Sequence, residues 1–157
     1  ECKLFYPSHF DTTIVLDKIN NPFVEKIKYN STPLTGKSKF IFYLYSKSLL
    51  MPVPESVIIA SIFITINMSF KKIYLFGADH SWITDFKVYE DNTSSFTLNH
   101  FDSKDIKTNN DRSVSEFMVS QYRLFKSHEV LDEYSNFRNT KIINKTLNSF
   151  IDSYEKK

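Results

Sequence analysis

The pattern of apolar and polar positions predicts three structural elements in the first half of the chain. Residues 39–45 (KFIFYLY) are dense in residues that favour strands and predict a strand. Residues 52–69 contain an apolar run of about ten residues behind Pro54 and Glu55, which suit a first helical turn, so a buried helix is predicted. Residues 72–76 (KIYLF) are almost continuously apolar, which is typical of a strand covered on both faces.

The second half begins with a polar stretch and continues into a long amphipathic segment. Residues 83–112 are rich in Asp, Asn, Ser, Thr and Lys, and predict a lid-like loop with a short hairpin near residues 87–98. Ser113 and Glu116 have the spacing of a capping box and predict the start of a helix. The apolar face of this helix is expected to comprise Phe117, Met118, Gln121, Leu124, Phe125, His128, Leu131 and Tyr134.

The order of the elements predicts the fold class. Residues 140–143 predict a short strand, and residues 148–156 predict a terminal helix. Helices that alternate with strands predict a parallel sheet with crossover helices. We therefore expect an α/β fold in a single domain over residues 1–157, because a chain of this length forms one core of ordinary size. In the poorly patterned first part of the chain, residues 12–19 fit either a strand or a helix.

Composition and charge exclude several classes of protein. The net charge of +2 is too balanced for a dedicated nucleic-acid binder. The most apolar run, residues 57–66, falls well short of the roughly 20 residues of a membrane span. The single cysteine, Cys2, excludes an intramolecular disulfide and a cysteine-based zinc site. We therefore expect a cytoplasmic protein without a transmembrane segment or a nucleic-acid partner, and leave association with the inner face of a membrane open.

Glycine is scarce, which removes whole families of phosphate-binding motifs. The chain has only two glycines, Gly36 and Gly77, so neither GxGxxG nor GxxxxGK[ST] can occur. The HExxH spacing of metal ligands is absent too, and we expect no metal site and no cofactor. Each remaining glycine is expected to occupy a demanding backbone position.

Candidate chemistry gathers in the segment GADHSW, directly after the predicted strand at residues 72–76. Ligands of open parallel sheets bind outside the carboxyl ends of the strands. Gly77 would let the backbone approach a ligand, and Asp79 could accept hydrogen bonds from ribose or sugar hydroxyls. His80 could shuttle a proton, and Trp82 could stack on a base or a pyranose ring. The alternative is a tight turn in which Asp79 caps the backbone and Trp82 packs inside.

The sequence predicts different roles for two other histidines, His100 and His128. His100 stands in the polar loop, where a lid could carry it into a site as a catalytic base, although a solvated loop residue is the alternative. His128 lies on the apolar face of the predicted helix, which favours a core histidine over a catalyst.

The segment VPESVIIASIFITINMSFKKIYLFGADHSW resembles a block shared by two groups of bacterial proteins. These are the sialyltransferases of the Campylobacter type (glycosyltransferase family 42) and uncharacterised surface-polysaccharide proteins with a pterin-pyrophosphokinase-like (MptE-like) domain. In both, a helix leads into a strand of the form K-x-I-Y-L-x-G-x-D, here residues 71–79. The tail FKSHEVLDEYSNFRNTKIINKTLNSFIDSYEKK is similar to their last helix, strand and short helix.

This resemblance implies a Rossmann-like three-layer fold with a mostly parallel sheet and a metal-independent glycosyltransferase. The substrate would be a nucleotide-activated sugar, CMP-sialic acid in the characterised relatives, and the acceptor a glycan of capsule or lipopolysaccharide. Gly77 and Asp79 would line the nucleotide site of the donor. Glu55 and Ser56 match the polar segment that contacts the donor in this family.

Some parts of the family pattern have no counterpart. The first of two lid tyrosines that bind the departing phosphate falls near Ser81 and Trp82, and the second has no match. The lid histidine that acts as base is also unmatched, which leaves His100 as the nearest candidate. The Gly-Asn-Gly-Pro-Ser-like phosphate loop at the front of the family's domain is absent, so we expect either a partial domain or one that has lost this half.

Three functions remain open on this basis. The first is a sialyltransferase-like glycosyltransferase, in which a base deprotonates an acceptor hydroxyl that displaces the nucleotide at the anomeric carbon. The second is a pyrophosphokinase-like enzyme that uses ATP and magnesium. The third is a non-catalytic binding domain, which the missing phosphate loop favours.

Overall fold

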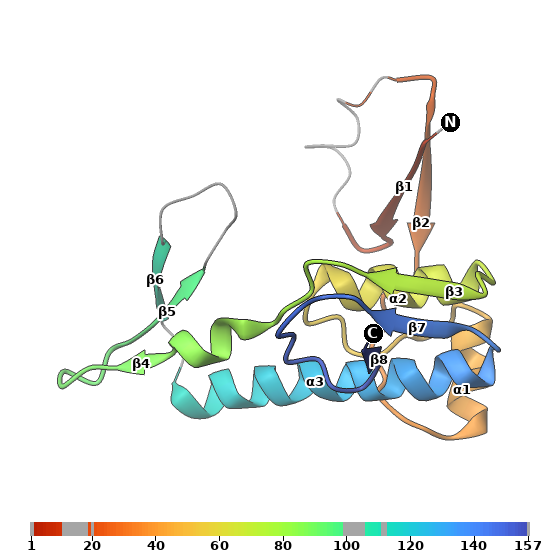
Figure 1. Cartoon of the computed structure of the whole chain (residues 1–157). Helices are drawn as coiled ribbons and strands as arrows, with labels where there is room; N and C mark the ends of the chain where they lie inside the picture. Colours follow the sequence, from red (N-terminus) through yellow and green to blue (C-terminus); the bar gives the residue numbers. More distant parts are fainter. Residues whose placement is uncertain (1, 11–18, 20, 99–105, 111–112, 157) are drawn as a thin grey trace.

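The computed structural model describes residues 2–10, 19, 21–98, 106–110 and 113–156 of the chain. These residues form a mixed α/β structure with three α-helices, one short 3-10 helix and small sheets, two of them parallel (Figure 1). Residues 12–18, for which the sequence left strand and helix open, lie outside the described residues.

The first helix, α1 (Lys39–Ser46), lies where the sequence predicted a strand, and that prediction is wrong. The Ser38 side chain caps the helix by accepting a hydrogen bond from the backbone N–H of Ile41 at 3.2 Å. Phe42 and Tyr45, one helical turn apart, are buried in the core. The cap and this packing outweigh the strand preference of aromatic and β-branched residues, which depends strongly on context.

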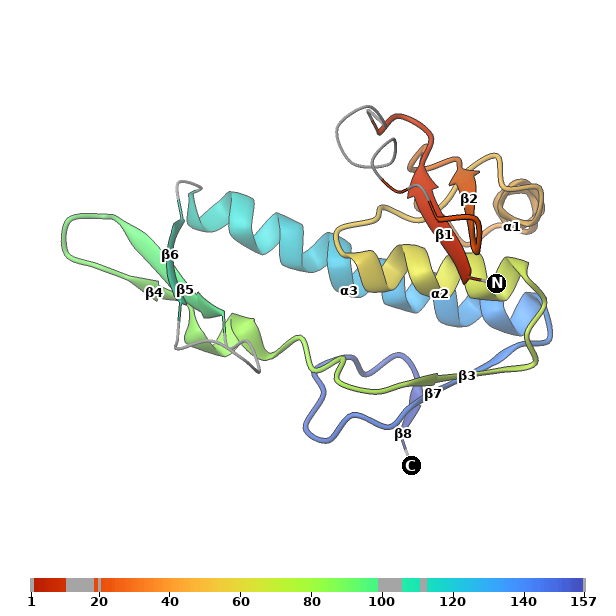
Figure 2. The same cartoon turned by 90° about the horizontal axis from the view of Figure 1, so that it is seen from above.

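The helix and the strand predicted next are both present, as α2 (Val57–Asn67) and β3 (Lys72–Leu75). The expectation that the strand is covered on both faces is wrong, since Tyr74 and Phe76 are 48% and 76% exposed. β3 pairs in parallel with β7 (Lys141–Asn144), which confirms the strand predicted at residues 140–143. Figure 2 shows α2 lying alongside α3 (Val114–Phe137).

The predicted terminal helix over residues 148–156 is wrong. The segment consists of turns and a short strand, β8 (Glu155–Lys156), which pairs in parallel with β7. Asn148 has a φ of 55°, which is outside the right-handed helical region. Ser149 donates its hydroxyl to the carbonyl of Ala78 at 2.6 Å and so ties the segment to the end of β3.

The long helix α3 begins as predicted, because Ser113 and Glu116 form a complete capping box. Most of the predicted apolar face is buried, with Phe125 only partly so. Met118 is the exception, since it is 45% exposed. It lies one residue along from buried Phe117 and turns towards solvent.

An aromatic cluster joins the three helices. It contains Phe42 and Tyr45 of α1, Phe63 of α2, and Tyr134 and Phe137 of α3. The rings of Tyr45 and Tyr134 meet edge to face with centroids 5.3 Å apart. Phe42, Tyr45, Phe63 and Tyr134 belong to the hydrophobic core, so the three helices share it.

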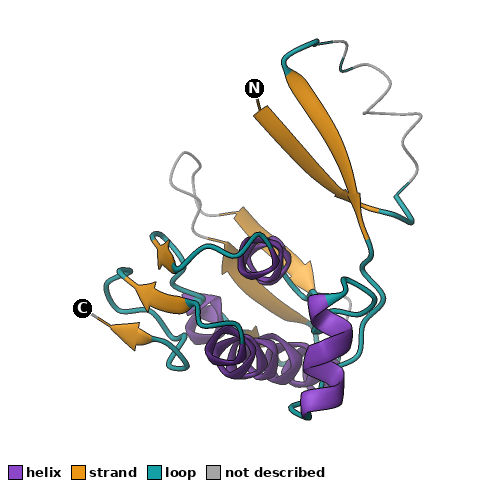
Figure 3. Ribbon diagram, turned by 90° about the vertical axis from the view of Figure 1, so that its right-hand side faces the viewer, coloured by secondary structure: helices purple, strands orange, loops and turns teal. Residues whose placement is uncertain are grey.

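The remaining strands form two further sheets. β1 (Cys2–Pro7) and β2 (Val24–Tyr29) make a parallel pair that stands away from the helices in Figures 1 and 3. β4 (Lys87–Val88), β5 (Ser94–Leu98) and β6 (Ile106–Asn110) make an antiparallel sheet after the 3-10 helix η2 (Ser81–Asp85). The hairpin predicted near residues 87–98 is confirmed as β4–β5, whereas the rest of the predicted loop contains more structure than expected.

The sheet formed by β3, β7 and β8 has its helices to one side in Figure 3, with α1 farthest from it. A mixed α/β fold is therefore present, without an evident three-layer arrangement. Among the helices in the described part of the chain, none is both long enough and apolar enough to cross a membrane.

Candidate functional site

The turn after β3 is built around Gly77. Its φ of +70° lies in the left-handed region, and a Cβ added there would meet no other heavy atom within 4 Å. The need for glycine is therefore conformational rather than steric. The next residue, Ala78, donates its N–H to Thr146 Oγ1 at 3.0 Å, so the turn is held against the segment after β7.

We expect Gly77→Ala to lower the free energy of unfolding by about 1–2 kcal/mol, the cost of a left-handed backbone at a non-glycine residue. Urea denaturation would measure it. Gly77→Asn is the matched comparison, because asparagine tolerates this region better, and it should recover part of the loss. Equal losses in the two variants would contradict this explanation.

Asp79 projects its carboxylate at the surface beyond the turn. Its Oδ2 accepts a hydrogen bond from Ser81 Oγ at 2.8 Å, and its backbone carbonyl accepts one from the N–H of Phe150 at 2.7 Å. A carboxylate offers about four acceptor positions. The exposed group therefore retains acceptor capacity for the hydroxyls of a ligand.

Trp82 is partly buried and anchored to α3. Its Nε1 donates to Gln121 Oε1 at 2.9 Å, and its ring lies 4.6 Å, centroid to centroid, from the ring of His80. This geometry agrees with the alternative in which Trp82 packs inside. A stacking contact between Trp82 and a ligand stays a prediction.

His80 is buried and belongs to a hydrogen-bonded group that spans three segments. Its Nε2 lies 3.0 Å from Nε2 of His128 on α3, and Nδ1 of His128 lies 2.9 Å from the hydroxyl of Tyr154. His80 is 1% exposed and His128 is fully buried. Since a neutral imidazole has one donor and one acceptor, the two rings and the phenol can form a continuous chain of hydrogen bonds.

Burial keeps both imidazoles neutral. Desolvation lowers the pKa of His80 to about 4, and the nearby Asp79 carboxylate opposes this only in part. Desolvation, together with His80, lowers the pKa of His128 to about 3. A buried, weakly basic His80 suits a structural role, so its proposed proton transfer stays a prediction. His100, the other candidate base, lies outside the described residues.

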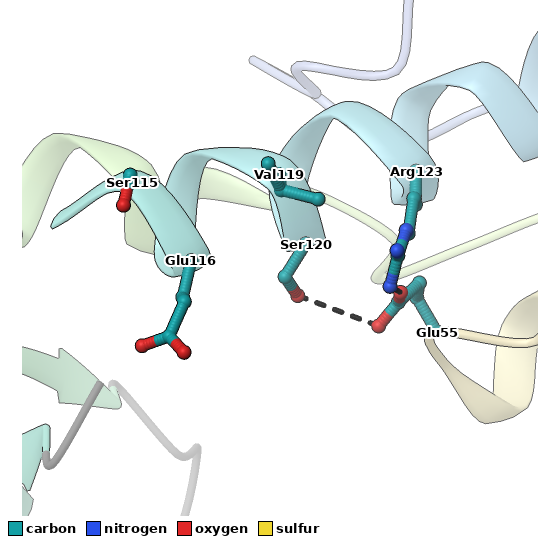
Figure 4. Close-up of a pocket in the computed structure, with 6 residues that line it drawn as sticks. All are labelled: Glu55, Ser115, Glu116, Val119, Ser120 and Arg123. Atoms are coloured by element: carbon teal, nitrogen blue, oxygen red, sulfur yellow. Dashed lines mark hydrogen bonds and ion pairs between the residues drawn. The ribbon is translucent and has the colours of Figure 1, made fainter. Parts of the chain in front are cut away.

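Glu55 lines a pocket between the start of α2 and the first turns of α3. Its carboxylate accepts a hydrogen bond from Ser120 Oγ at 3.4 Å and lies 3.8 Å from Nη1 of Arg123 (Figure 4). The pocket has a volume of about 460 Å³ and is lined by Glu55, Ser115, Glu116, Val119, Ser120 and Arg123. Acceptors and donors of hydrogen bonds therefore face the same space.

Ser56, predicted with Glu55, is the N-cap residue of α2 but makes no capping hydrogen bond with its side chain. Its Oγ is buried, and none of the described residues forms a hydrogen bond with it. A role for Ser56 in donor binding stays a prediction.

One turn of α3 links the two parts of the predicted site. Ser120 contacts Glu55, whereas its neighbour Gln121 contacts Trp82. The described lining of the Glu55 pocket does not include the residues of the turn after β3, so the predicted residues do not share this pocket.

Arg123 and Ser120 were not predicted as site residues. Both lie on the expected polar side of α3, where polar residues are ordinary and do not indicate a site. Gln121 could be identified from the sequence as a polar residue on the predicted apolar face of α3. Its hydrogen-bond partner, Trp82, could not. Within the described residues, no three His, Cys, Asp or Glu side chains come together as metal ligands.

Comparisons of the chain with models of known protein families, with curated proteins and with solved structures found no match.

Proposed function

We propose that the chain provides the nucleotide-sugar site of a sialyltransferase-like glycosyltransferase acting in bacterial surface-polysaccharide synthesis. The observation that carries the proposal is the end of β3. There a left-handed Gly77 leads into the exposed carboxylate of Asp79 at the carboxyl end of a parallel strand. This is the position where open α/β sheets bind their ligands, and it coincides with the G-x-D motif.

The arrangement of the helices supports the same placement. In Figure 1 the starts of α2 and α3 point to the same side of the molecule as the carboxyl ends of β3 and β7. The amino terminus of a helix favours anions such as phosphate. A donor at this side would meet Asp79 through the ribose hydroxyls of its nucleotide, and the first backbone N–H groups of α2 through its phosphate.

The Rossmann-like three-layer fold is part of this proposal. It would require further strands beside β3 and a second covering layer. Two features support it: Tyr74 and Phe76 are 48% and 76% exposed, and within the described residues β3 pairs only with β7. Apolar strands of parallel sheets are usually covered on both faces.

The reaction would be a direct displacement, in which an acceptor hydroxyl attacks the anomeric carbon as the nucleotide leaves. Asp79 would hold the donor, and the hydroxyl proton would pass to a base other than the buried His80. His80 is buried with its Nε2 on His128, and an exposed base at the acceptor would have to come from elsewhere.

Calorimetric titration of the chain with a panel of nucleotide sugars tests the proposal. At least one should bind, and Asp79→Ala should weaken it about tenfold or more, because hydrogen bonds to a charged group contribute roughly 1.5–3 kcal/mol. Asp91→Ala is the matched control, since it removes an exposed carboxylate in the β4–β5 turn. Absence of binding to the whole panel, or equal loss in both variants, would refute the proposal.

A non-catalytic binding domain is the second candidate, and the burial of His80 favours it. Consumption of the nucleotide sugar distinguishes a binding domain from a glycosyltransferase. A glycosyltransferase should consume the bound nucleotide sugar in the presence of glycan acceptors, whereas a binding domain would leave it intact.

A further inference from the structure

The pocket beside Glu55 has a defined chemistry. Glu55 and Glu116 contribute carboxylates, Arg123 contributes a guanidinium, and Ser115 and Ser120 contribute hydroxyls. Figure 4 shows Glu116 and Ser120 projecting from the same side of α3, with Arg123 and Ser120 converging on Glu55. The volume of about 460 Å³ lies within the roughly 300–1,000 Å³ typical of ligand pockets.

Among the described residues of this lining, Arg123 is the one cation, and it already has a partner. Arg123 lies 3.8 Å from the Glu55 carboxylate, whose side chain is only 21% exposed. The Glu116 carboxylate also lines the pocket and accepts the N–H of Ser113 at 2.8 Å and its hydroxyl at 3.0 Å. An acidic ligand would have to compete with the Glu55 carboxylate for Arg123.

A neutral ring with several hydroxyls meets no such obstacle. Adjacent hydroxyls can donate to the two oxygens of Glu55 and accept from the guanidinium of Arg123. Ser120 and Ser115 can act in either direction. The mixture of fixed acceptors and donors therefore matches a sugar ring better than a carboxylate or a phosphate.

We propose that the pocket beside Glu55 binds a neutral sugar ring of hexose size and disfavours acidic sugars. The inference rests on the proposed function and makes it more specific. The sugar transferred would be a neutral hexose, unlike the sialic acid of the characterised relatives. Glu55 would be the specificity-determining residue, because it both accepts the hydroxyls and occupies Arg123.

Saturation-transfer NMR with methyl β-D-galactopyranoside and with the methyl glycoside of N-acetylneuraminic acid tests this on the intact chain. The galactoside should receive saturation from the protein, and the acidic glycoside should receive little. Glu55→Gln frees Arg123 and removes one negative charge. It should weaken galactoside binding about tenfold and increase binding of the acidic glycoside.

Glu25→Gln is the matched control, because Glu25 forms an exposed ion pair with Lys3 on the separate β1–β2 sheet, and it should change neither signal. Stronger wild-type binding of the acidic glycoside, or a Glu55→Gln variant indistinguishable from wild type, would overturn the inference. Galactoside binding that depends on Glu55, with no nucleotide sugar bound, would support this pocket and refute the proposed function. Nucleotide-sugar binding that depends on Asp79, together with galactoside binding that Glu55→Gln leaves unchanged, would support the proposed function and refute the inference about this pocket.

Discussion

Acidification from pH 7 to pH 5 is expected to lower the free energy of unfolding by about 4 kcal/mol through His80 and His128 alone. Burial lowers the pKa of His80 to about 4 and that of His128 to about 3, whereas both titrate near 6.5 in the unfolded chain. Between these values the unfolded state binds protons that the folded state does not. The stabilisation is therefore complete above about pH 6.5 and declines as the pH falls towards the folded values.

The magnitude follows from the proton affinities. Each histidine contributes about 1.4 kcal/mol per pH unit below 6.5, which gives roughly 2 kcal/mol apiece at pH 5. Typical domains have only about 5–15 kcal/mol of stability, so the effect should be large. Urea denaturation at several pH values between 7 and 5 measures it in a range where most carboxylates stay ionised.

Two variants show whether the buried pair is responsible. The double substitution of His80→Phe with His128→Leu removes both titrating groups and should flatten the pH dependence by most of the 4 kcal/mol. His9→Gln is the matched control, because it removes a surface histidine beside Ser31 that lies outside this hydrogen-bonded pair. An undiminished slope in the double variant would show that other groups carry it.

Tyr134→Ala should cost about 3–5 kcal/mol of stability, the range for deleting a large buried aromatic side chain. Tyr134 is fully buried, and its ring lies within 6 Å of Phe42, Tyr45 and Phe63, centroid to centroid. Its hydroxyl also donates to Asn67 Oδ1, whose amide in turn donates to the carbonyl of Tyr45. The substitution would leave a cavity where α1, α2 and α3 meet.

Urea denaturation of two further variants separates the contributions. Tyr134→Phe keeps the ring and loses only the hydrogen bond, so it should cost about 1 kcal/mol. Tyr122→Ala changes the same residue type on the same helix at a position that is 66% exposed, and it should alter stability little. A loss for Tyr134→Ala within 1 kcal/mol of that for Tyr122→Ala would contradict the central role of the cluster.

Several elements were predictable because their signals are local. The start of α3 follows from Ser113 and Glu116, whose reciprocal hydrogen bonds involve residues three apart. The strands β3 and β7 follow from short apolar runs, and α2 from a longer one behind Pro54. The demanding backbone at Gly77 also followed from the sequence, because glycine is scarce and this one directly follows a strand.

Tertiary contacts overrode local preference in two places. Residues 39–45 have a strand-like composition, yet they form α1 because Phe42 and Tyr45 bury one helical face against α3. The end of the chain forms turns and β8 because Ser149 bonds to Ala78 and Tyr154 bonds to His128. These partners lie far along the chain, so no local pattern could indicate them.

The sequence by itself determined which segments become α2, β3, α3 and β7, and it placed Gly77 and Asp79 at the end of a strand. Only the tertiary structure decided that His80 faces His128, 48 residues away, and that Glu55 shares a pocket with Ser120 and Arg123. The physical reason is that secondary structure depends on neighbours within a turn or a strand. The burial, charge and pKa of a side chain depend instead on whichever segments folding brings around it.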